Sequence, residues 1–208
     1  MSVSRRQLMV LAAAFTMTAA LPFSASAKIV SVEEAMTDLV YGNADAKVEV
    51  IEYASLACPA CQYFHDNLFP QIKAEYIDTG KIRFIYRDFP TNSAALAASM
   101  IARCAGPDRH GAMNDMFFST QRQWAHSDNP LQAIGMVARM AGLGPNEIDQ
   151  CIKNTELMKS IQDGAKKAST EMGVNATPTV FIAGKMLEHT MDMKKVKAAL
   201  DAAIEAAQ

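Results

Sequence analysis

The sequence lacks an excess of positive charge. Its 208 residues include 20 lysines and arginines against 22 aspartates and glutamates, which gives a formal net charge of −2 at pH 7. Nucleic-acid binding depends on a basic patch, because Lys and Arg must neutralise the phosphates. The charge balance gives no support to that class of protein, and we expect no nucleic acid partner.

Metal-ligating residues are also scarce, with four histidines and four cysteines in the whole chain. Cys58 and Cys61 form a C-x-x-C pair, which is the spacing of half a zinc site. Neither Cys104 nor Cys151 has a second cysteine or a histidine at ligand spacing, so the other half is missing. A copper(I)-binding module is a remote alternative, because the fourteen methionines are more simply core filler in helices than metal ligands. We expect neither a metal nor a cofactor.

Long apolar runs are absent except at the N-terminus. There Arg5 and Arg6 precede an uncharged stretch over 8–23, and a small-residue cleavage pattern follows. These features predict a signal peptide over 1–27 that is cleaved after Ala27, and a permanent membrane span is the weaker interpretation. The paired arginines leave both the Sec and the twin-arginine export routes open. We expect the mature protein in the periplasm, where cysteines can pair.

The most informative feature that is present is the pair Cys58 and Cys61. Residues 47–53 read as a strand and 59–77 as a helix, so Cys58 lies at a helix N-terminus. Unpaired N–H groups and the helix dipole favour a thiolate there, and Pro59 suits the first helical position because its missing N–H has no helical partner. We predict Cys58 as the exposed nucleophile and Cys61 as the shielded thiol that resolves a mixed disulfide. A merely structural disulfide is the alternative.

The order of the elements predicts an α/β fold of the thioredoxin type. A short strand at 38–41 and the strand–helix unit are followed by another strand at 81–87, which gives a β-α-β unit with parallel strands. Helical patterns then cover 93–104, 111–123, 131–140, 145–153 and 156–172. Strands return at 179–182 and 185–187, before an amphipathic helix over 191–207. We expect a thioredoxin-like domain in two parts, 28–91 and 173–208, around an inserted all-helical domain at 92–172.

Two motifs together resemble the DsbA family of periplasmic thiol:disulfide oxidoreductases. They are EYASLACPAC at 52–61 and GVNATPTVFI at 173–182, and RDFP at 87–90 is also typical of the family. The resemblance implies that Cys58 is the nucleophile and Cys61 the resolving thiol. It also implies that the residues Thr177 and Pro178 form a cis-proline loop that binds an extended substrate peptide opposite the C-x-x-C. From the sequence alone, a trans proline at a strand start is the simpler alternative.

The same resemblance assigns two further features. Glu52 would be a buried acid that relays the proton of Cys61, whereas the alternative is a solvent-facing strand residue. Cys104 and Cys151 would form a second disulfide inside the helical domain, whereas the alternative is a pair of buried free thiols. His65, four residues after Cys61, could tune the site from the helix side, although a surface or satisfied histidine is the simpler interpretation.

The resemblance implies an enzyme that introduces disulfides into unfolded or reduced exported proteins and is reoxidised by a DsbB-like membrane partner. The chain departs from the best-known oxidases of the family at Ala60, where they have a histidine. Ala60 cannot donate a hydrogen bond to the Cys58 thiolate, so we expect a less oxidising disulfide. A disulfide reductase or isomerase, kept reduced by a membrane electron donor, is the alternative. Because only about twenty residues separate Lys28, the expected start of the mature chain, from the strand at 47–53, we expect no dimerisation stalk and a monomer.

Overall fold

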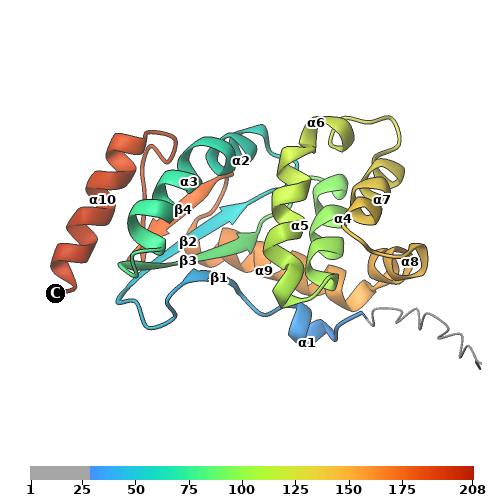
Figure 1. Ribbon diagram of the computed structural model, residues 1–208, viewed down its shortest axis with the longest axis horizontal. Helices are drawn as coiled ribbons and strands as arrows, with labels where there is room; N and C mark the ends of the chain where they lie inside the picture. The colour runs from blue at the N-terminus through green and yellow to red at the C-terminus, as the bar shows by residue number, and fades with distance from the viewer. Residues whose placement is uncertain (1–28) are drawn as a thin grey trace, which may run out of the picture.

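The computed structural model describes residues 29–208, so the expected signal peptide at 1–27 lies outside the described residues. The centre of the fold is a five-stranded sheet with the order β1-β3-β2-β4-β5, in which β2 and β3 run parallel and the other neighbours antiparallel (Figure 1). The parallel pair is the predicted β-α-β unit. The strands are β1 (Leu39–Gly42), β2 (Val48–Ala54), β3 (Ile82–Asp88), β4 (Thr179–Ile182) and β5 (Lys185–Met186).

One long helical segment connects β2 to β3. It consists of α2 (Pro59–Tyr63), η1 (Phe64–Leu68), α3 (Phe69–Ile72) and η2 (Lys73–Ile77), where η marks a wider π-helical turn. The π-helical turn η1 ends two residues before Pro70. Pro70 has no N–H to donate to the carbonyl four residues earlier, and the Phe69 N–H bonds instead to the Phe64 carbonyl, five residues back.

The two faces of the sheet are covered by different helices. Alternate residues of a strand point to opposite faces, so Val50 faces α2–η2 and α10 (Met193–Ala206), while Ile51 faces α9 (Thr155–Met172). Glu52, two residues after Val50, must lie on the same face as Val50. The alternation of side chains along β2 therefore directs the Glu52 carboxylate toward the helical segment that follows Cys58.

The helical domain stands at one end of the sheet (Figure 1). Its helix α5 begins at Pro107, four residues before the start that we predicted at 111, because Pro107 occupies the first helical position, where a missing N–H costs nothing. Among residues 29–208, no helix has both the length and the apolar character needed to cross a bilayer. The short helix α1 (Val32–Ala35) precedes the sheet in the sequence. The helical domain contains α4 (Ser93–Cys104), α5 (Pro107–Ser119), α6 (Gln121–Trp124), α7 (Pro130–Met140) and α8 (Pro145–Lys153) in addition to α9.

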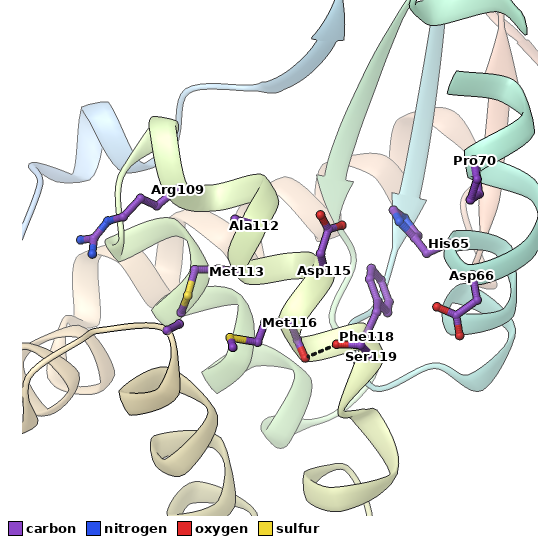
Figure 2. A pocket seen from close by; sticks show the side chains of 11 residues that line it. His65, Asp66, Pro70, Arg109, Ala112, Met113, Asp115, Met116, Phe118 and Ser119 are labelled. Carbon is purple, nitrogen blue, oxygen red and sulfur yellow. Dashed lines mark hydrogen bonds between the residues drawn. The ribbon is translucent and has the colours of Figure 1, made fainter. Parts of the chain in front are cut away.

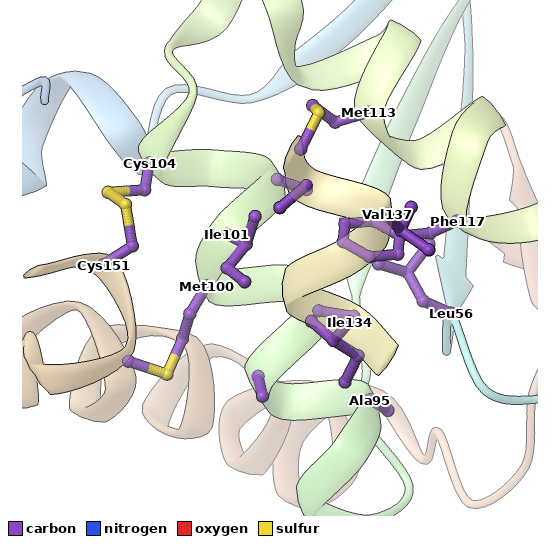
Figure 3. Packing of buried hydrophobic residues seen from close by; sticks show 14 of the residues in the cluster. Leu56, Ala95, Met100, Ile101, Cys104, Met113, Phe117, Ile134, Val137 and Cys151 are labelled. Atoms are coloured by element: carbon purple, nitrogen blue, oxygen red, sulfur yellow. A yellow bond between two sulfur atoms is a disulfide. The ribbon is translucent and has the colours of Figure 1, made fainter. Parts of the chain in front are cut away.

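A disulfide joins two helices of this domain. Cys104, the last residue of α4, is bonded to Cys151 in α8, and both cysteines are buried (Figure 3). Beside the disulfide, Ile101 of α4 and Val137 of α7 belong to the same buried core, together with Phe117 of α5. The covalent link and the apolar core therefore hold the same helices together.

Candidate redox-active site

Cys58 and Cys61 lie at the start of α2, in the order that the sequence predicted. Cys58 is the N-cap residue and is half-buried, and Pro59 follows at the first helical position. Cys61 is completely buried, and its sulfur accepts a hydrogen bond from the Ser55 N–H at 3.5 Å. A partner molecule can therefore reach the first sulfur but not the second.

The surroundings separate the acidities of the two thiols. A hydrogen bond from the Cys61 side chain makes the largest contribution to the pKa of Cys58, which falls to about 5 although partial burial opposes the shift. The Thr177 side chain and the backbone N–H groups of Cys61 and Ala60 lower it further, as expected at a helix N-terminus. Burial raises the pKa of Cys61 far above its ordinary value, and the Cys58 sulfur and the charge of Glu52 add to that increase. The site thus pairs an accessible thiolate with a buried thiol that keeps its proton.

The loop before β4 lies against Cys58. The peptide bond between Thr177 and Pro178 is cis, and the Thr177 carbonyl oxygen lies 3.3 Å from the Cys58 sulfur. Both loop residues are half-buried. The two motifs that are 119 residues apart in the sequence therefore form one site.

Glu52 lies beneath this site with none of its surface exposed. Its Oε2 atom is 3.0 Å from Nε2 of His65, and its Oε1 atom has no hydrogen-bond partner among residues 29–208. The solvent-facing alternative for Glu52 is therefore wrong. Since the charge of Glu52 raises the pKa of Cys61, the two groups interact electrostatically.

His65 is a residue whose position the sequence did not predict. The ring is buried, stacks on Phe118 of α5 with the ring centroids 4.3 Å apart, and contacts Glu52 on β2. The available signal was its spacing of four residues from Cys61, which places both on one face of the helix. That spacing did not reveal the carboxylate partner, since Glu52 belongs to another element.

Two glutamines attach the C-x-x-C segment to the helical domain. The side-chain amide of Gln121 in α6 donates to the Leu56 carbonyl at 2.7 Å and to the Cys58 carbonyl at 3.0 Å. Gln62 of α2 donates to the Phe118 carbonyl at 2.8 Å. No sequence pattern indicated either contact, because a single glutamine carries no periodic signal.

The motif at 87–90 contributes a buried ion pair at the boundary of the two domains. Asp88, at the end of β3, pairs with Arg103 of α4, and Arg103 also donates to the Ala35 carbonyl at 2.9 Å. Burial acts to raise the pKa of Asp88, but the charge of Arg103 outweighs it and holds the pKa below its usual value. Within residues 29–208, no three His, Cys, Asp or Glu side chains are grouped so that they could hold a metal ion.

Known proteins share both this sequence pattern and this fold. A Rickettsia bellii protein that is named as a protein-disulfide oxidoreductase is 32% identical to this chain. The match covers 81% of this chain and 65% of the Rickettsia protein. The chain spans about 60–65% of the length of the five Rickettsia relatives that it matches.

Solved structures agree with this relationship. Wolbachia pipientis alpha-DsbA1 superimposes with a TM-score of 0.73 at 30% identity, over 83% of this chain and 93% of that chain. BdbD from Bacillus subtilis superimposes with a TM-score of 0.71, over 85% of this chain and 96% of that chain, and at 20% identity it supports the fold alone. The family model described as Thioredoxin matches residues 34–202. The chain therefore belongs to the thioredoxin family, and its thioredoxin fold carries the inserted helical domain of the DsbA proteins.

Proposed function

We propose that the chain is a thiol:disulfide oxidoreductase that introduces disulfides into other proteins through Cys58 and Cys61. In this reaction a substrate thiolate attacks the accessible Cys58 sulfur of the oxidised enzyme, and the bond to Cys61 breaks. The substrate's second thiolate then attacks the mixed disulfide and forms the substrate disulfide, which leaves both enzyme cysteines reduced. Two electrons pass from the substrate to the enzyme in each cycle.

The observation that carries this proposal is the position of Cys58, a half-buried residue at the N-terminus of α2, where its surroundings lower the pKa of the thiol to about 5. A depressed pKa means that the thiolate is stabilised, and the thiolate exists only in the reduced enzyme. Stabilising the reduced form makes the disulfide a stronger oxidant, which favours oxidation of substrates over their reduction. A reductase would instead need a disulfide that is stable relative to its two thiols, so that the thiols give up their electrons to substrates.

The remaining site residues have proposed roles that follow from their positions. The loop of Thr177 and Pro178, beside Cys58, would pair with an extended peptide of the substrate, because backbone groups there lie next to the reactive sulfur. Glu52 would exchange the proton of Cys61, whose pKa responds to its charge. The disulfide between Cys104 and Cys151 would be structural, since both sulfurs lie in the core of the helical domain.

The proposed substrates are unfolded or reduced proteins that contain cysteines and are exported. The proposed location of this chain is the same compartment, the periplasm. A buried disulfide such as Cys104–Cys151 is stable in an oxidising compartment, which supports that location. Reoxidation of Cys58 and Cys61 would require a membrane partner of the DsbB type. We propose that the protein works as a monomer.

The redox state of Cys58 and Cys61 in living cells tests this function. Free thiols would be trapped with a bulky maleimide, and the modified and unmodified proteins separated by electrophoresis. An oxidase is expected to be mostly oxidised, and a mostly reduced pair would instead assign a reductase or isomerase. Purified oxidised protein should also form disulfides in a reduced, unfolded test protein, and the absence of this transfer would overturn the proposal.

A further inference from the structure

The proposed reaction creates a proton-transfer problem inside the fold. When a substrate thiolate attacks Cys58, the electron pair of the broken S–S bond goes to the Cys61 sulfur. Cys61 is fully buried and its pKa is raised, so this sulfur must take up a proton. Glu52 is also fully buried, so it cannot collect that proton from solvent directly.

His65 connects Glu52 to a cavity that reaches the surface. Its Nε2 atom lies 3.0 Å from Glu52 Oε2, and the ring also lines a cavity of about 690 Å³ between η1 and α5. The wall of the cavity includes the exposed residues Asp66 and Asp115, so the cavity is accessible to solvent. Figure 2 shows the His65 ring and the Asp115 carboxylate on the two helices that face each other across the cavity.

Several charged and titratable groups surround the ring of His65. Glu52 faces it from β2 and Asp115 from α5, while Asp66 is its neighbour on the same helix and Arg109 lies on the wall of the same cavity. Two tyrosines complete the surroundings. The ring centroid of Tyr86 on β3 lies 5.9 Å from that of His65. Tyr41 on β1, whose pKa burial raises, lies near enough to Asp115 and Glu52 for their charges to raise that pKa further.

The two tyrosines carry no charge that would compete with His65. Burial raises the pKa of Tyr86 and of Tyr41 well above the ordinary value, so both stay neutral. Desolvation raises the pKa of Asp115, and the charge of His65 opposes that shift, so His65 and Asp115 interact across the cavity. The surroundings of His65 are therefore mainly acidic, with Arg109 as the cation on the same cavity wall.

We propose that His65 is a positioning residue for proton transfer, which passes protons between the cavity and Glu52 and thereby serves Cys61. The inference rests on the proposed redox function. One proton moves in each step: Glu52 gives a proton from Oε1 to the Cys61 thiolate, His65 gives one from Nε2 to Glu52 Oε2, and solvent in the cavity gives one to the other ring nitrogen of His65. In the reverse direction, the same chain removes the proton of Cys61.

The atoms of Glu52 suit this sequence of steps. Oε2 is occupied by His65, whereas Oε1 has no partner within the described part of the chain and is left for the proton of Cys61. A carboxylate that receives a proton at one oxygen and releases it from the other needs no movement of the chain. The stacking of His65 on Phe118 holds the ring in the orientation that reaches both Glu52 and the cavity.

The experiment compares wild type, His65→Gln and the matched control His189→Gln, whose histidine is exposed on the loop before α10. Glutamine at 65 can still bond to Glu52 but cannot carry a proton. The rate at which a reduced two-cysteine peptide reduces the enzyme disulfide is measured from pH 5 to 8. We expect this rate to be about 100-fold lower in His65→Gln, because a general acid typically contributes a factor of that order. We also expect the plot of rate against pH to lose the inflection that a titrating histidine produces. The control should match wild type.

Two further measurements separate proton transfer from a structural role. Alkylation of Cys58 needs only its thiolate, so its rate should be the same in His65→Gln and wild type. Imidazole in the buffer should restore much of the peptide reaction in His65→Ala, because the cavity can admit it. If His65→Gln keeps the wild-type rate and pH profile, or if its slower rate keeps that profile and His65→Ala is not rescued, the inference is overturned. If wild type itself does not react with the peptide, the proposed function fails as well.

Discussion

The Cys58 sulfur lies 3.3 Å from the carbonyl oxygen of Thr177, although the two residues are 119 positions apart in the sequence. This contact brings the beginning of α2 and the loop before β4 together, so a peptide that pairs with the loop would pass over the reactive sulfur. The helical domain contributes to the same place through Gln121, which bonds to the Cys58 carbonyl. Three parts of the chain therefore meet at one residue, Cys58.

The two active-site cysteines should fail in different ways when replaced. Cys58→Ser is expected to abolish thiol–disulfide exchange, because the accessible sulfur is lost. Cys61→Ser should still capture substrates but accumulate mixed disulfides, since the buried thiol that resolves them is missing. Non-reducing electrophoresis of the purified variants with a reduced substrate checks both. Equal and complete loss of capture in the two variants would contradict the assignment.

The acidity of Cys58 predicts a specific pH dependence. With a pKa of about 5, the thiol is almost fully ionised at neutral pH, so its alkylation rate should be constant above about pH 6 and fall as the pH drops through 5. The folded pKa is depressed, so the stabilisation of the reduced protein is complete above the unfolded pKa of about 8.5 and disappears toward pH 5. The thiolate's ultraviolet absorbance measures the pKa directly. A midpoint near 8 would contradict the prediction.

Ala60→His should make the disulfide more oxidising. An imidazole at this position, beside the N-terminus of α2, can donate a hydrogen bond or positive charge to the Cys58 thiolate and so stabilise the reduced form. A single hydrogen bond to a charged sulfur, about 1.4 kcal/mol, corresponds to a shift of about 30 mV for a two-electron couple. Equilibration with glutathione measures the potential, with Ala60→Gln as a neutral control. An unchanged or more reducing potential would show that residue 60 does not set it.

Removal of the second disulfide should affect stability and not chemistry. In the chain-entropy account, a link across a sequence separation of 47 residues stabilises the fold by about 4 kcal/mol. Cys104→Ala combined with Cys151→Ala is therefore expected to lower the free energy of unfolding by up to that amount while exchange at Cys58 continues. Denaturant unfolding of the oxidised proteins measures the difference. A double variant that folds normally but loses exchange would assign this disulfide a role in the reaction.

Gln121→Ala should weaken the attachment of the C-x-x-C segment to the helical domain. The substitution leaves the buried carbonyl of Leu56 without this donor, which costs about 1–3 kcal/mol. Gln123→Ala, at an exposed position of the same helix, is the matched control and should change stability by less than about 0.5 kcal/mol. Chemical denaturation compares the two variants. Equal stabilities would show that these hydrogen bonds contribute nothing to the attachment.

The sequence predicted those features that depend on local patterns. The strand at 47–53, the helix after Cys58 and the helical patterns of the insertion are all visible as periodic apolar positions, and the structure has an element at each. The C-x-x-C pair needed only its spacing and its place after a strand. The order of strands and helices then indicated the thioredoxin-type fold.

Contacts between distant elements could not be predicted in the same way. The pair of Glu52 and His65 depends on the register of β2 and on the turn η1, which together bring a strand residue and a helix residue within 3.0 Å. The ion pair of Asp88 and Arg103 likewise joins a strand end to a helix of the other domain. Each partner alone has a simple solvated alternative, so the signal exists only once the fold is known.

The shortness of β5 has a consequence for how this edge of the sheet can pair with another extended chain. An exposed sheet edge offers unpaired N–H and C=O groups that can recruit another strand and begin aggregation. On the side of β5 the edge strand has only two residues, Lys185 and Met186, so it offers few backbone groups for pairing. The charge of Lys185 also disfavours pairing with another strand. An extended polypeptide would therefore gain little by adding to this edge.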